Sequence, residues 1–290
     1  MENLFEKGCL VQLSTSVWGA TRKIKPEQLP EIPVSSEWLR ASKKLVDPEA
    51  LKPINKVITK ARSHITGVSL PFPIKSMEFV PKETITRVDA RLNEFKSEFN
   101  RTVESFMESY DRLREVAMVN LGDLFDEMEY PLDIRSKFAF VWRFIILDVP
   151  NGNTALLAPE VYEREKEKFV QTMEQARELA VQSLREEFAG MVERITERFS
   201  TGPGGKPKVF KNSTVDNLYE YFETFKERNI FKDEQMEELV GRAQAILGGS
   251  SADAIRSSEH LKERIQDGMK DVELVMADIL SRPRRKIVMN

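Results

Sequence analysis

The chain has 290 residues, of which 44 are Lys or Arg, 47 are Asp or Glu, 2 are His and 1 is Cys. This length is enough for one large or two small domains with a buried core. Charged residues make up 31% of the chain, yet the net charge is only −3. Such a mixture of both signs is typical of long solvated helices, whereas a disordered tail usually carries charges of one sign. The single Cys9 excludes an intramolecular disulfide, and two isolated histidines argue against a His/Cys zinc site.

Signals for export and membrane insertion are weak. The first eight residues contain acids where a signal peptide needs a basic region followed by an apolar run. The most apolar window, residues 138–149, is shorter than the ~20 residues of a spanning helix and contains Arg143 and Asp148. We therefore expect a soluble, cytoplasmic protein from a bacterial or viral-host cell.

The N-terminal region, residues 1–80, is expected to hold one strand and short helices. Residues 9–18 alternate apolar and polar side chains and are rich in β-branched types, which predicts a half-buried strand. A short helix is expected to begin at Ser35 and end near Asp47, another to cover 49–65, and residues 77–80 to form a short strand.

Two long apolar stripes then predict two long helices. The first helix is expected over residues 82–119, where apolar side chains recur with a mean spacing of about 3.5 residues, the repeat of a left-handed coiled coil. The second is expected over 159–199, where the mean spacing is about 3.75 residues and the stripe drifts around the helix. We expect the two helices, of similar length, to form an antiparallel, coiled-coil-like hairpin over residues 81–200.

The segment that joins these helices, residues 120–158, is expected to form an apolar β-like tip. Acidic side chains come first, and Pro131 together with the lack of EF-hand spacing favours a solvated or partner-facing surface over a metal site. An alternating aromatic run follows and favours a strand, which would pair with residues 9–18 or 77–80. This run is either the core of a small head or an exposed docking element. The candidate partner-binding residues are Phe138, Phe140, Trp142, Phe144, Asp126, Glu127 and Glu129.

The C-terminal region, residues 201–290, is expected to be a helical module behind a Gly- and Pro-rich boundary. Helices are predicted over 218–227, from Asp233 to about Leu247, and from Ser250 or Ser251 to Leu280. Pro283 ends the last helix and a basic tail follows, formed by Arg282, Arg284, Arg285 and Lys286. This tail is either a solvated helix end or a contact to nucleic-acid phosphates.

The residues that could carry catalysis are isolated from one another. His64 and His260 lie in predicted helices without a recognisable Ser or Cys nucleophile nearby, and Cys9 heads an apolar strand. The run from Gly202 to Lys206 lacks the spacing of a phosphate-binding loop. We therefore expect no enzymatic activity, no cofactor and no metal.

Several short segments, in the same order along nearly the whole chain, resemble a bacterial and phage family catalogued only as a domain of unknown function. The segments are Val17-Trp18-Gly19, Pro71-Phe72-Pro73, Ile134 to Phe138, Asn217-Leu218, Phe222 and Phe225, Asn229-Ile230, Ala252 to Arg256, and Arg284 to Ile287. Members of that family are often encoded near MoxR-type AAA+ ATPases and von Willebrand A-domain proteins. The resemblance implies association with an ATPase or chaperone-like system and assigns no functional residue.

Together these features predict a mainly α protein that works as a non-enzymatic interaction or scaffold protein. It would be an adaptor to an AAA+ ATPase or von Willebrand A-domain protein, or a self-assembling homo-oligomer. A first alternative is a membrane-active bundle that inserts residues 138–147, and a second is a nucleic-acid-associated protein that uses the basic tail.

Overall fold

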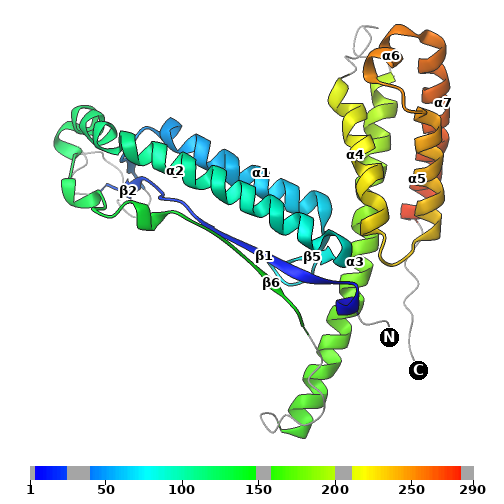
Figure 1. Ribbon diagram of the computed structural model, residues 1–290, viewed down its shortest axis with the longest axis horizontal. Helices are drawn as coiled ribbons and strands as arrows, with labels where there is room; N and C mark the ends of the chain where they lie inside the picture. Colours follow the sequence, from blue (N-terminus) through cyan, green and yellow to red (C-terminus); the bar gives the residue numbers. More distant parts are fainter. Residues whose placement is uncertain (1–3, 25–39, 148–157, 200–210, 282–290) are drawn as a thin grey trace. The chain divides into compact units, whose positions relative to one another are not determined.

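The computed structural model describes residues 4–24, 40–147, 158–199 and 211–281, and it is mainly helical with a small antiparallel sheet (Figure 1). Two compact units are present, and each is assembled from segments far apart in the chain. The bundle unit consists of Met1–Cys9, Val68–Thr84 and Ile146–Asn290, and the ribbon unit consists of Leu10–Gly67 and Ile85–Ile145. This division differs from the three consecutive domains expected, because the chain crosses between the units four times.

A long antiparallel pair of strands, part of a four-stranded sheet, runs through the ribbon unit. β1 (Gly8–Ser16) pairs antiparallel with β6 (Ala139–Ile145), so that Leu10 lies opposite Ile145 and Ser16 opposite Ala139. Both strands were predicted, and of the two partners considered for the aromatic run the N-terminal strand is the correct one. A smaller pair joins β2 (Thr21–Lys23) to β3 (Ser42–Lys44), where the end of a short helix was expected.

Two helices lie side by side in the ribbon unit, α1 (Lys52–Val68) and α2 (Ile85–Leu121) (Figure 1). A 3₁₀ turn, Pro48–Leu51, precedes α1, and α2 ends where Gly122 adopts a left-handed conformation with φ +51°. Three more 3₁₀ turns, Gly122–Leu124, Glu127–Glu129 and Arg135–Lys137, lead from α2 to β6. The predicted stripe of α2 is buried, at positions Val88, Leu92, Phe95, Phe99, Val103, Phe106 and Tyr110.

The described residues of the bundle unit form five helices and the hairpin of β4 (Leu70–Pro71) with β5 (Glu78–Pro81). Turns Leu4–Glu6 and Lys82–Thr84 flank its strands. The long helix α3 (Pro159–Phe199) packs against α4 (Asn212–Arg228), α7 (Glu259–Ser281) and β4. α5 (Glu234–Leu247) and α6 (Ala252–Ser257) complete the bundle by packing on α7.

The C-terminal helices begin and end at capping residues. The Asp233 carboxylate accepts a hydrogen bond from the Met236 amide, and Gly248 ends α5 with φ +54°. The single helix expected from Ser251 to Leu280 is divided into α6 and α7. Ser258 causes the division, because its backbone is extended and its hydroxyl accepts the Leu261 amide as a new N-cap.

The apolar stripes of α2 and α3 are buried within separate units, so the expected hairpin of these two helices is not confirmed. The α2 stripe packs on β6, where the Phe99 and Phe140 rings lie 5.5 Å apart. The α3 stripe is covered by α4 and α7, where Phe188 stacks on Tyr221. The two long helices were predicted correctly, and each stripe is covered by elements of its own unit. No helix in the described residues has the length and apolarity to cross a bilayer.

Candidate functional site

The predicted aromatic residues of β6 divide between the core and a half-buried position. Phe138 and Phe140 are buried, and their rings lie 5.5 Å from Phe106 and Phe99 respectively. Trp142 is half-buried and donates a hydrogen bond of 2.8 Å from Nε1 to the Asp89 carboxylate. Phe144 is half-buried as well. Of the two interpretations considered, the core of the unit is therefore correct for Phe138 and Phe140, and their assignment as exposed docking residues is wrong.

The predicted acidic residues lie directly after α2, and each of them has a partner within the ribbon unit. Asp126 caps a 3₁₀ turn by accepting the Met128 amide at 3.0 Å. Glu127 forms an ion pair of 2.6 Å with Arg114 of α2, and Glu129 forms one of 2.6 Å with the buried Lys43 of β3. The Arg114 contact joins the segment after α2 to that helix, and the Lys43 contact joins it to β3. The described residues contain no group of three metal-ligating side chains.

Exposed apolar side chains are concentrated at this same place. Met128 is 91% exposed, Val119 is 79% exposed and Leu132 is fully exposed. The Tyr110 hydroxyl lies 3.4 Å from the Pro131 carbonyl, which places the returning segment beside the last turns of α2. We call this region the α2-end surface and define it by Val116, Met118, Val119, Met128 and Leu132, all exposed. Several large apolar groups exposed within one short segment point to an interaction site.

Sequence patterns did not single out the apolar members of this surface. Val119 and Met118 lie beyond the end of the regular stripe, and Met128 and Leu132 stand among acids and a proline. The available signal was a run of apolar residues, 116–119, with three members off the buried face of α2. The other predicted candidates, Arg282, Arg284, Arg285 and Lys286, lie outside the described residues.

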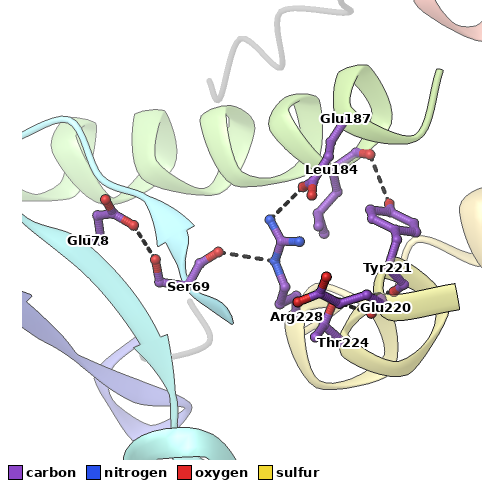
Figure 2. Close-up of polar contacts among 8 residues, drawn as sticks. All are labelled: Ser69, Glu78, Leu184, Glu187, Glu220, Tyr221, Thr224 and Arg228. Carbon is purple, nitrogen blue, oxygen red and sulfur yellow. Dashed lines mark hydrogen bonds and ion pairs between the residues drawn. The ribbon is translucent and has the colours of Figure 1, made fainter. Parts of the chain in front are cut away.

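A buried polar network in the bundle unit is the second candidate (Figure 2). Arg228, the last residue of α4, is 2% exposed and forms an ion pair of 2.7 Å with Glu187 of α3. Its Nε donates a hydrogen bond of 3.1 Å to the carbonyl of Ser69, whose hydroxyl in turn bonds Glu78 of β5. The network therefore ties the β4–β5 hairpin to two helices.

The hydrogen bonds and the ion pair of this network connect parts of the bundle unit to one another. The Tyr221 hydroxyl donates to the Leu184 carbonyl at 2.9 Å, and burial, assisted by the charge of Glu187, raises the pKa of Tyr221 far above its usual range. A phenol with such a pKa stays protonated, so it cannot act as a base near neutral pH. Arg228 Nη1 is buried without a hydrogen-bond partner among the described residues.

His64 of α1 faces the α2 core and should make stability depend on pH. Its ring lies 6.0 Å from that of Phe95, and its Nε2 is buried without a hydrogen-bond partner in the described residues. Burial, followed by the positive charges of Arg91 and Arg87, lowers the pKa of His64. The unfolded chain therefore binds the proton more readily, and folding stability falls as the pH drops through the unfolded value of about 6.5.

The effect is the decrease in the unfolding free energy when the pH is lowered from about 8 to about 5. We expect His64→Leu to lose less stability on acidification than the unmodified chain, because the variant has no imidazole to protonate. His260→Leu, at an exposed position of α7, is the matched control and should keep the original pH dependence. Equal losses in the His64 variant and the control would contradict this account.

Comparisons with known proteins assign a family to the chain. A family model described as "Protein of unknown function (DUF3150)" matches residues 5–199, about two thirds of the sequence. The chain therefore belongs to this family, in agreement with the resemblance to an uncharacterised domain. No curated protein and no solved structure matches it.

Proposed function

We propose that this member of a family without known function is an interaction or scaffold protein that binds a protein partner through the α2-end surface. The observation that carries the proposal is the exposure of five large apolar side chains within residues 116–132. Large apolar side chains are enriched in the buried centre of protein interfaces, and this short segment exposes five of them.

Polar contacts tie the segment that carries this surface to β3 and to the residue that follows it. Lys43 is 5% exposed and bonds both the Leu124 carbonyl and the Glu129 carboxylate. The Tyr130 hydroxyl donates to the Leu45 carbonyl at 2.8 Å. Because these contacts fix the backbone on both sides of Met128, little conformational entropy is lost when a partner binds.

The partner expected for this surface is a protein with apolar and basic groups. Residues 115–134 contain six acids and neither Lys nor Arg. Arg114 and Lys43 neutralise two of these acids, and the other four favour positive charge on the partner. An AAA+ ATPase or a von Willebrand A-domain protein is the first class to test, because the family resemblance associates them with this chain.

The proposal can be tested by placing a photocrosslinking residue at position 132 in cells of the source organism. Position 274 on α7, where Leu274 is 70% exposed, is the matched control. We expect a discrete protein adduct from position 132 only. The captured protein, once purified, should bind Met128→Ser/Leu132→Ser about tenfold or more weakly than the unmodified chain, since interface anchors cost ~1–2 kcal/mol each.

The variant Ile146→Ser/Leu274→Ser removes two exposed apolar groups elsewhere in the chain. It should bind the captured protein with the affinity of the unmodified chain. Identical adducts from positions 132 and 274, or equal affinities for the two double variants, would refute the proposed docking role.

A further inference from the structure

The α2-end surface combines apolar contact area with negative charge. Between Arg114 and Arg135 the chain has six acids and no basic residue. Two of these acids, Glu127 and Glu129, are paired with Arg114 and Lys43. Like charges oppose the association of this surface with an identical one, so a two-fold contact between α2-end surfaces is disfavoured.

The chain itself carries a segment with the complementary chemistry. Residues 282–289 lie outside the described residues and follow the end of α7 at Ser281. Their sequence places the basic residues first and then three apolar ones, in the order Arg282, Pro283, Arg284, Arg285, Lys286, Ile287, Val288 and Met289. Four positive charges followed by apolar side chains match an acidic surface with exposed Met, Val and Leu.

Resting on the proposed function, we infer that the α2-end surface of one molecule binds segment 282–289 of a second copy of the chain. Binding of the segment within its own molecule is the opposite outcome, in which the chain stays monomeric at every concentration. The contact joins two different surfaces, so it is heterologous and leads to head-to-tail assembly.

Sedimentation velocity of the full chain over a range of concentrations tests this inference. The mass should increase with concentration at low salt and increase less at high salt, because charge contributes to the contact. Arg284→Glu/Arg285→Glu and Met128→Ser/Leu132→Ser should each weaken self-association about tenfold or more. Arg264→Glu/Lys270→Glu, the same charge reversal at exposed positions of α7, should leave it intact.

Mixing the two impaired variants provides the decisive result. One variant keeps an intact surface and the other an intact segment, so an equimolar mixture should form a one-to-one complex and nothing larger. A monomer at all concentrations, or unchanged association of the Arg284/Arg285 variant, would overturn the inference.

The outcome also separates the inference from the proposed function. If Met128→Ser/Leu132→Ser weakens binding of the crosslinked partner while segment variants change no sedimentation property, only the inference fails. If the Met128/Leu132 variant changes neither measurement, both fail.

Discussion

Replacing Phe140 with alanine should lower the unfolding free energy of the ribbon unit by about 3–5 kcal/mol. The Phe140 side chain is 3% exposed, and its ring lies 5.5 Å from Phe99 and 6.1 Å from Trp142. Its removal leaves a cavity between β6 and the middle of α2, which the close-packed aromatic neighbours fill only in part. Chemical denaturation followed by circular dichroism measures the loss.

Val141 offers a matched control in the adjacent position of the same strand. Its side chain is 45% exposed on the other face, so Val141→Ala should change the unfolding free energy by only about 0.5 kcal/mol. An effect of Phe140→Ala no larger than that of Val141→Ala would contradict the burial of the aromatic face. A loss of assembly with full stability would instead favour the docking role that the aromatic run alone suggested.

Helices and strands were largely predictable because their periodicity is local. The stripe from Val88 to Tyr110 specifies one buried face of a helix, and the alternation from Phe138 to Trp142 specifies one buried face of a strand. The cap at Asp233 was predictable for the same reason, since its carboxylate acts on an amide three residues away.

The partners of these faces were not predictable from the same patterns. A stripe shows which face is buried, but any apolar face of suitable length can cover it. The similar lengths of α2 and α3 favoured mutual packing, yet β6 packs on α2, and α4 and α7 pack on α3. The division of the chain into two units follows from these long-range contacts, which no local spacing encodes.

The candidate site, too, was predictable only as far as local sequence patterns describe it. The acids Asp126, Glu127 and Glu129 were identified as a surface cluster, and the structure places them beside exposed apolar groups. The exposure of Val119 and Met128 depends on how the segment after α2 folds back, which rests on the contacts of Lys43 and Arg114. Arg228 was not identified because its partners, Ser69 and Glu187, lie far away in the chain.

Arg228→Met should destabilise the bundle unit by about 2–4 kcal/mol, the largest effect expected from a single polar substitution there. The variant leaves the Ser69 carbonyl without its buried donor and Glu187 without its cation. Because the Glu187 side chain remains 30% exposed, solvent offsets part of the cost of an unpaired carboxylate. Arg256→Met removes an exposed i,i+3 pair with Asp253 and an exposed hydrogen bond to Asn212, and it should cost only about 1 kcal/mol.

A double-mutant cycle distinguishes the loss of an ion pair from the loss of packing. Arg228→Met/Glu187→Leu removes both charges, so it should be less destabilised than the sum of Arg228→Met and Glu187→Leu, with a coupling of about 1–3 kcal/mol. Unfolding free energies from urea titrations of the four proteins give this coupling directly. Strict additivity would mean that Arg228 stabilises the unit only through its aliphatic stem and its bond to Ser69. In that case the β4–β5 hairpin would be held to α4 by the Ser69 contact and not through a charge on α3.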